Sequence, residues 1–277
     1  MKINVIIPTF NRFSVLSRAI ESVLKQTYKN FDLTIVDDGS TDDSYSLVKT
    51  YFDDKRVHYI RTDNRGVSAA RNLGVCLTRG EFVSFLDSDD EWLEDKLEKQ
   101  IDLLKEQPEL KCIHGEEIWI RNGKRVNKKK IHQKFGGSVF EKCLDLCFIS
   151  PSSVLIKRDL YKEMNGFDED YAVCEDYDLW LKITSLHDIG FVKTPIMNKY
   201  GGHEDQLSSK YFAMDYFRIK SLDRIVQIRD LSASRKEQVI DTIIKKASIL
   251  LKGYEKHENF KDHAEIKNIL DKFLLKR

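Results

Sequence analysis

Four short apolar runs, each followed by a segment whose apolar residues recur at helical spacing, constrain the fold of this chain most strongly. The runs cover 3–7, 31–36, 57–60 and 81–86, and the helical segments cover 16–24, 44–52, 67–77 and 93–104. Runs that are apolar throughout are typical of strands in a parallel sheet, because crossover helices cover both of its faces. The sequence therefore predicts an α/β fold with a mainly parallel central sheet flanked by helices.

Polar residues follow each of the four predicted strands. They are Thr9 and Asn11, Asp37 and Asp38, Asn64 and Arg65, and the acidic stretch 87–90. In open sheets of this kind, ligands bind beyond the carboxyl ends of the strands. We therefore expect these residues to converge on one polar site.

The acidic stretch after the fourth strand holds three carboxylates, those of Asp87, Asp89 and Asp90, within four residues. Like charges at this spacing repel one another, so they need a nearby cation, contact with solvent, or a role in capping a following helix. Mg²⁺ or Mn²⁺ takes carboxylate oxygens and shares its remaining positions with phosphate, so the stretch predicts a metal site for a diphosphate. Helix capping by Ser88 or Asp90 is the structural alternative.

The middle of the chain changes character. The segment 111–120 and the turn Asn122-Gly123 predict a β-hairpin, and 153–157 predicts a strand. The basic run 128–130 is interpreted as a solvated loop, or as a contact for an acceptor or lipid phosphate.

Helices dominate the remainder. A largely buried helix is expected over 177–186, with Glu175 and Asp176 in its first turn. The chain after about Tyr211 is predicted to be all-helical, with apolar stripes at 239–251 and 266–274. We expect these stripes to pack on the main domain, with a homodimer interface or a membrane surface as the alternatives.

Composition limits the class of protein. The chain has 277 residues, 41% of them hydrophobic, and a net charge of +1, so it can bury a large core and has no overall signature of nucleic-acid binding. From Ser208 onward it carries 16 Lys and Arg against 10 Asp and Glu, which indicates either an anionic partner or solvated helix faces. The five scattered cysteines and the lack of a long apolar stretch predict a cytoplasmic protein with reduced thiols.

Five motifs occur in an order that resembles a known family. They are PTFN at 8–11, VDDGSTD at 36–42, ARN at 70–72, DSD at 87–89 and EDYDLW at 175–180. Together they resemble the inverting family 2 glycosyltransferases of GT-A fold, over 2–209. The resemblance implies a GT-A catalytic domain over 1–210, with a nucleotide-binding half (1–107) and an acceptor half (108–210), and a helical C-terminal extension over 211–277.

The resemblance also implies roles for individual residues. Asp176 would be the catalytic base, Thr9, Asn11, Asp38, Arg71 and Asp87 would bind the nucleotide, and Asp89 and His203 would bind the metal. Within this set, Asp38 would accept a hydrogen bond from a uracil-type imide. The structural alternatives are an Asx turn for Asp38, a surface ion pair for Arg71 and ordinary first-turn acids for Glu175 and Asp176.

Two departures from the family pattern affect the expected phosphate contacts and the expected type of transferase. An arginine commonly follows the late tyrosine in the family, but Gly201 follows Tyr200 here, which puts one phosphate contact in doubt. A QxxRW segment does not occur in the sequence, which favours a single-addition enzyme over a processive polymer synthase.

The implied function is metal-dependent, inverting transfer of a sugar from a nucleoside-diphosphate donor, expected to be UDP-linked, to a glycan or lipid-linked acceptor during surface glycan synthesis. Mn²⁺ or Mg²⁺ would be the cofactor. A sugar-phosphate nucleotidylyltransferase, a non-catalytic nucleotide-sugar-binding subunit and a retaining mechanism stay open as alternatives. Peripheral membrane contact or a homodimer through the C-terminal helices is also left open.

Overall fold

The structure is a computed structural model that describes residues 1–202, 213–258 and 260–275. The first half of the chain contains β1 (Ile3–Thr9), α1 (Phe13–Leu24), β2 (Phe31–Asp37), α2 (Ser44–Lys49), β3 (Val57–Arg61), α3 (Val67–Cys76), β4 (Phe82–Phe85), β5 (Glu91–Trp92) and α4 (Lys96–Glu106). This order confirms the predicted alternation of strands and helices up to β4.

The second half mixes strands with short helices before it becomes helical. It contains β6 (Cys112–Arg121), β7 (Lys124–Val126), the 3₁₀ turn η1 (Lys130–His132), α5 (Phe140–Asp145), the 3₁₀ turn η2 (Pro151–Ser153), β8 (Leu155–Lys157), α6 (Arg158–Glu163), α7 (Glu175–Thr184) and β9 (Gly190–Gly201). The helices α9 (Met214–Ile228), α10 (Ala233–Lys256) and α11 (His263–Leu274) follow.

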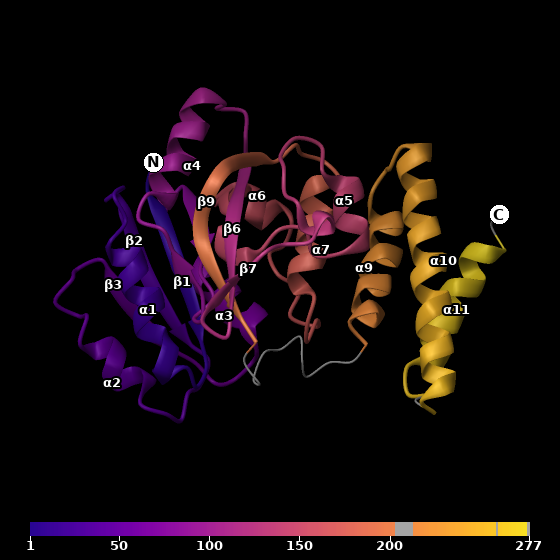
Figure 1. The fold of residues 1–277 in the computed structure, drawn as a ribbon, viewed down its shortest axis with the longest axis horizontal. Coiled ribbons are helices and arrows are strands. Elements are labelled where there is room, and N and C mark those ends of the chain that lie inside the picture. The colour runs from indigo at the N-terminus through magenta and orange to yellow at the C-terminus, as the bar shows by residue number, and fades with distance from the viewer. Residues whose placement is uncertain (203–212, 259, 276–277) are drawn as a thin grey trace.

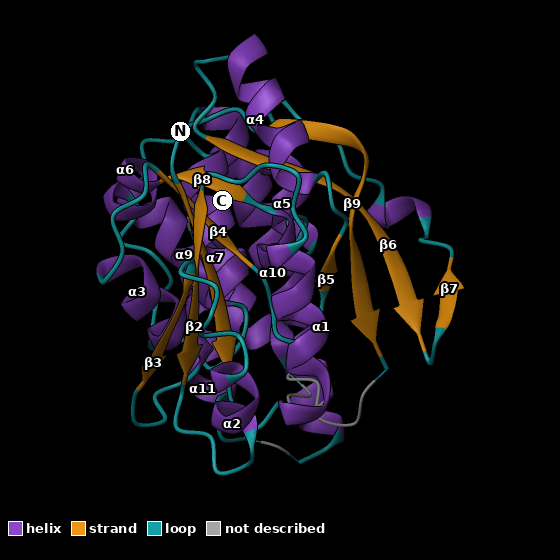
Figure 2. Ribbon diagram, turned by 90° about the vertical axis from the view of Figure 1, so that its left-hand side faces the viewer, coloured by secondary structure: helices purple, strands orange, loops and turns teal. Residues whose placement is uncertain are grey.

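The described strands form one nine-stranded sheet in the order β3-β2-β1-β4-β8-β6-β9-β5, with β7 paired to β6. Strands β3, β2, β1 and β4 are parallel, as predicted. Strand β8 runs antiparallel to both β4 and β6, whereas β6 and β9 are parallel to each other. The second half of the sheet is therefore mixed, and β6, β7 and β9 splay away from the parallel strands (Figure 2).

The apolar runs are buried on both faces of the sheet, and this explains why they do not alternate with polar residues. Along β1, Val5 belongs to one hydrophobic cluster together with α1 and α4, whereas Ile6 belongs to the opposite cluster. Ile35 and Val36 divide in the same way along β2. Successive side chains of a strand point to opposite faces, so a strand covered on both sides must be apolar throughout.

The predicted β-hairpin is confirmed, but one long strand was missed. Asn122 and Gly123 both have positive φ angles, 49° and 71°, as a tight two-residue hairpin turn requires. Strand β9 was not predicted, because Lys193, Pro195 and Asn198 interrupt its apolar pattern. It is held instead by its pairing with β6, which contains register shifts at Glu116.

The three C-terminal helices pack on the domain that contains the sheet. Ile219, Ile243 and Phe273 are fully buried and belong to the same hydrophobic cluster as Trp180 of α7. Figure 1 shows α9, α10 and α11, in orange to yellow, stacked beside α5 and α7. The expected packing of the apolar stripes is therefore confirmed. No helix within the described ranges is long and apolar enough to cross a bilayer.

Candidate active site

The carboxyl ends of β1 and β2 lie side by side and join two of the predicted motifs. Thr9 pairs with Asp37 in the parallel register, and the Asp38 amide donates to the Thr9 carbonyl at 2.8 Å. The amide of Asn11, a residue with a φ of 52°, donates to Ser40 Oγ at 2.9 Å. Asn11 Oδ1 accepts from the Thr41 amide at 2.8 Å. Asn11 therefore holds the loop that follows Asp38.

Asp38 and Thr9, at the ends of β2 and β1, both have side-chain groups that could bind a nucleoside. Asp38 is buried and accepts from the Arg65 amide at 2.9 Å and the Gly66 amide at 2.8 Å, one on each carboxylate oxygen. Burial raises the pKa of Asp38 although these two amides oppose the shift. Each oxygen retains a second acceptor direction for a ligand. The buried Thr9 hydroxyl has no hydrogen-bond partner among the residues that the structure describes.

Arg71 joins two motifs that are far apart in the sequence. Its Nη2 lies 2.7 Å from Asp87 Oδ1, and its Nη1 lies 2.6 Å from Glu175 Oε1. The guanidinium carbon lies 4.8 Å from the centre of the Phe167 ring. Burial opposes the charge of Arg71, but the two carboxylates outweigh it and raise the pKa further. A surface ion pair, the structural alternative for Arg71, is therefore wrong, because its side chain is only 4% exposed.

The acidic stretch is fixed by the turn η2. Ser152 Oγ accepts from the Asp87 amide at 3.1 Å and donates to Asp90 Oδ2 at 2.7 Å. Asp90 Oδ1 accepts from the Tyr200 amide at 3.0 Å, so this carboxylate ties the stretch to β9. Burial and the charges of Asp89 and Asp87 raise the pKa of Asp90 well above its usual range. Helix capping by Asp90 is wrong, because the residue before α4 is Asp95.

Asp87 and Asp89 remain the candidates for a metal ion. Both side chains are half-buried, and the Asp89 carbonyl accepts from Arg18 Nη2 at 2.5 Å. Within the described ranges, no group of three or more His, Cys, Asp or Glu side chains is placed to hold a metal by itself. His203, the third predicted contributor, lies outside the described residues. Two carboxylates fit Mg²⁺ or Mn²⁺ when diphosphate oxygens complete the shell.

Asp176 lies in the first turn of α7. Cys174, the residue before this helix, has a left-handed backbone conformation with a φ of 65°. Asp176 Oδ1 accepts from the Tyr177 amide at 2.7 Å, and Asp176 Oδ2 lies 3.0 Å from the Cys147 thiol. The neighbouring Glu175 is buried against Arg71. Burial and the charge of Asp176 raise the pKa of Glu175 to about 7, although Arg71 opposes the shift. Its burial and its contact with Arg71 therefore distinguish Glu175 from an ordinary first-turn acid.

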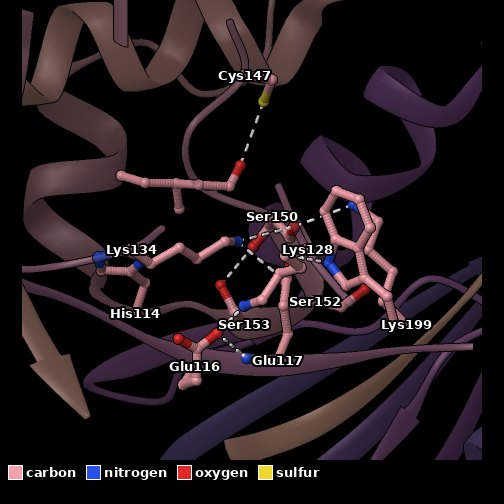
Figure 3. Close-up of polar contacts among 12 residues, drawn as sticks. His114, Glu116, Glu117, Lys128, Lys134, Cys147, Ser150, Ser152, Ser153 and Lys199 are labelled. Atoms are coloured by element: carbon pink, nitrogen blue, oxygen red, sulfur yellow. Dashed lines mark hydrogen bonds and ion pairs between the residues drawn. The ribbon is translucent and has the colours of Figure 1, made fainter. Parts of the chain in front are cut away.

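A cluster of buried and half-buried polar groups, which we call the Ser150 cluster, lies next to the acidic stretch. It consists of Glu117, Lys134, Ser150 and Lys199 (Figure 3). Lys199 Nζ and Lys134 Nζ donate to Ser150 Oγ at 3.0 and 3.3 Å, and Lys134 pairs with Glu117 Oε2 at 2.9 Å. Burial opposes the charge of Lys199, but Glu117 and Asp90 outweigh it and raise its pKa.

Sequence reasoning missed the Ser150 cluster, Ser152 and Cys147. None of these residues lies in a motif, and only the position of Lys199 beside Tyr200 connects the cluster to one. The contacts of Ser152 and Lys199 arise because η2 and the end of β9 meet at the acidic stretch, and Cys147 contacts the first turn of α7.

Comparison with known sequences gives an independent result. Residues 4–164 match the model of the family described as glycosyl transferase family 2. An uncharacterized glycosyltransferase of Rickettsia felis is 39% identical over 190 residues, which cover 68% of this chain and 31% of that protein. The chain thus spans about a third of that relative's length. An Escherichia coli protein named UDP-Glc:alpha-D-GlcNAc-diphosphoundecaprenol beta-1,3-glucosyltransferase WfgD is 33% identical over 212 residues, 76% of this chain and 81% of that protein.

Solved structures show the same architecture. S. aureus TarS 1-349 in complex with UDP-GlcNAc superposes with a TM-score of 0.74 at 17% identity, covering 100% of this chain and 93% of that one. The mannosyltransferase PcManGT from Pyrobaculum calidifontis, in complex with GDP-Man and Mn²⁺, gives a TM-score of 0.64 at 14% identity, covering 99% and 85%. The sheet order, the ordered motifs and the match over more than half of the chain lead to one conclusion: the chain belongs to glycosyl transferase family 2 and has the GT-A fold.

Proposed function

We propose that this chain is a metal-dependent inverting glycosyltransferase that moves a sugar from a UDP-sugar to a hydroxyl group of a glycan or lipid-linked acceptor. The observation that carries the proposal is the Arg71 bridge, which holds Asp87 and the first turn of α7 against a single guanidinium. This bridge brings the acidic stretch next to the turn that carries Asp176. Donor-binding and proton-accepting groups belong together in a transferase, because attack and departure occur at one carbon.

In the proposed reaction, the acceptor hydroxyl attacks the anomeric carbon while the nucleoside diphosphate departs from the opposite side. Asp176, in the first turn of α7, removes the hydroxyl proton. Asp87 and Asp89 would hold Mn²⁺ or Mg²⁺, whose charge neutralises the departing diphosphate. Thr9 and Asp38 would bind the nucleoside through the buried hydroxyl and the free acceptor directions described above.

The choice of donor and acceptor is supported by the comparisons. The E. coli relative is named for UDP-Glc and for a diphosphoundecaprenol-linked acceptor, and the chain covers 81% of it. TarS was solved with UDP-GlcNAc, whereas PcManGT was solved with GDP-Man and Mn²⁺. A UDP-sugar donor, a lipid-linked acceptor and a divalent cation are therefore the first combination to test, and surface glycan synthesis is the corresponding role.

Two variants test the proposal. Asp89→Ala should abolish Mn²⁺-dependent UDP binding, measured by calorimetry, because it removes a proposed ligand. Asp176→Ala should abolish transfer from UDP-glucose to a GlcNAc-diphospho-alkyl acceptor while UDP binding stays intact. Asp170→Ala is the matched control, since Asp170 is an exposed acid that precedes α7. Wild-type transfer by Asp176→Ala would remove Asp176 from the base role.

The alternatives left open by the sequence give different results in the same tests. A nucleotidylyltransferase would convert the UDP-sugar and labelled pyrophosphate into sugar 1-phosphate and labelled UTP. A non-catalytic subunit would bind the UDP-sugar without consuming it. A retaining enzyme would form a product that has the anomeric configuration of the donor, which NMR distinguishes.

A further inference from the structure

The thiol of Cys147 contacts the carboxylate that we assign as the base. Its Sγ lies 3.0 Å from Asp176 Oδ2 and 3.2 Å from the carbonyl oxygen of Ile149. Cys147 is half-buried on the segment that runs from α5 into η2, and Figure 3 shows it above Ser150. This segment is 29 residues away from Asp176 in the sequence.

The two oxygens of the Asp176 carboxylate are held by different donors. Oδ1 accepts from the Tyr177 amide at 2.7 Å within α7, and Oδ2 receives the thiol from outside the helix. One contact alone would leave the carboxylate free to rotate about its last bond, but two contacts on opposite oxygens fix its plane. We propose, resting on the general-base role given above, that Cys147 is a positioning residue that orients the Asp176 carboxylate toward the acceptor hydroxyl.

A thiol suits this task because it is a weak donor. A strong or charged donor would stabilise the carboxylate anion more and make it a poorer base, whereas a thiol fixes the geometry with a smaller effect on basicity. The thiol must stay protonated to donate. Burial and the adjacent charge of Asp176 raise the pKa of Cys147 well above its usual range, so the proton is retained.

Several other charged or titratable groups surround the pair of Cys147 and Asp176. They include Lys199 from β9, Arg218 from α9, and Glu175 and Cys174 at the start of α7. Glu175 contacts Arg71, and Asp176 is the acid of this turn that contacts the thiol.

The contact can be tested without any substrate. The negative charge of Asp176 suppresses thiolate formation, so Asp176→Asn should alkylate at Cys147 about tenfold faster with iodoacetamide at pH 8, followed by peptide mass spectrometry. Cys76 is exposed and serves as the internal control in the same sample. Its rate should not change between the two proteins. Equal rates at Cys147 in wild type and Asp176→Asn would overturn the proposed contact.

The positioning role is tested by kinetics of the full chain with UDP-glucose, Mn²⁺ and a GlcNAc-diphospho-alkyl acceptor. Cys147→Ala should lower kcat about tenfold with an unchanged KM for the donor, since only part of the contribution of a general base is lost. In the profile of kcat against pH, the acidic limb of this variant should move to higher pH, because the Asp176 carboxylate has lost a hydrogen-bond donor. Cys147→Ser should move this limb to lower pH, because a hydroxyl is the stronger donor.

Opposite shifts for Ala and Ser distinguish positioning from packing, because a packing defect would leave the limb in place. Cys76→Ala is the matched control and should match wild type. UDP binding by each variant verifies that it is folded. Unchanged kcat and pH profiles in both Cys147 variants, with Asp176→Ala inactive, would refute the positioning role alone. Full activity of Asp176→Ala would instead refute the proposed function on which it rests.

Discussion

The guanidinium of Arg71 donates to Glu175 Oε1 at 2.6 Å and so connects α3 to the first turn of α7, across 104 residues of sequence. The same guanidinium holds Asp87, which makes it the shared partner of two carboxylates. Glu175 is buried and Asp87 is half-buried, so neither charge is fully compensated by water. A buried ion pair of this kind contributes little net stability, but losing one partner is costly.

Arg71→Ala should destabilise the protein by about 3 kcal/mol, because it leaves the Glu175 carboxylate buried without its cation. Urea denaturation followed by circular dichroism measures this change in the free energy of unfolding. Arg65→Ala is the matched control, since the Arg65 side chain is 66% exposed in its pair with Glu169. The control should lose less than about 1 kcal/mol. Equal losses in the two variants would contradict the importance of the buried bridge.

Stability should depend on pH through Glu175. Burial and the charge of Asp176 raise the pKa of Glu175 from 4.5 to about 7, against the effect of Arg71. Between these values the folded protein keeps a proton that the unfolded chain has released, so the contribution of Glu175 to stability falls as pH rises. The contribution is complete below pH 4.5 and is lost above about pH 7.

Glu175→Gln removes this titration. The free energy of unfolding of wild type relative to Glu175→Gln should therefore fall by up to roughly 3 kcal/mol between pH 4.5 and pH 8. Urea titrations at several pH values measure this difference. A flat difference for Glu175→Gln would show that its carboxyl group titrates normally in the folded protein.

Ser152→Ala should loosen the acidic stretch, because it leaves the buried Asp90 oxygen and the Asp87 amide without the hydroxyl that both contact. We expect a loss of about 1–3 kcal/mol in stability. We also expect Mn²⁺-dependent UDP binding about tenfold weaker by calorimetry, from a loss of about 1.4 kcal/mol in binding free energy. Ser153→Ala is the control, since this equally buried hydroxyl donates to the Ser150 carbonyl and not to the acidic stretch. Unchanged UDP affinity in Ser152→Ala would contradict the assigned role.

The C-terminal helices should unfold together with the domain that holds the sheet. Ile243→Ala on α10 creates a cavity in the shared core and should cost about 2–5 kcal/mol. Ile249→Ala, on the same helix but 62% exposed, should change stability by less than about 0.5 kcal/mol. Denaturation followed by tryptophan fluorescence is an appropriate probe, because Trp92, Trp119 and Trp180 all precede α10. A transition unaffected by Ile243→Ala would mean that α10 unfolds separately.

Much of the fold could be predicted from local pattern. The apolar run of β1 specifies a strand buried on both faces, and the recurring Leu16, Ile20 and Val23 specify the helix that covers one of them. Asn122 and Gly123 specify their turn, because both positions need a positive φ. These features depend on neighbouring residues, and neighbouring residues are what a pattern records.

The site was predictable only in part. The sequence alone determined that Thr9, Asp38 and Asp87 lie at or just after the ends of strands of one sheet, since parallel strands that alternate with helices all end at the same edge. It did not determine that Arg71 is buried between Asp87 and Glu175, or that Cys147 and Ser152 contact Asp176 and the acidic stretch. Those contacts were decided by the tertiary structure, because they join segments 16 to 104 residues apart through side chains whose types carry no periodic signal. Long-range polar contacts form only after the core has packed, so burial and partner geometry, rather than residue type, decided which charges meet.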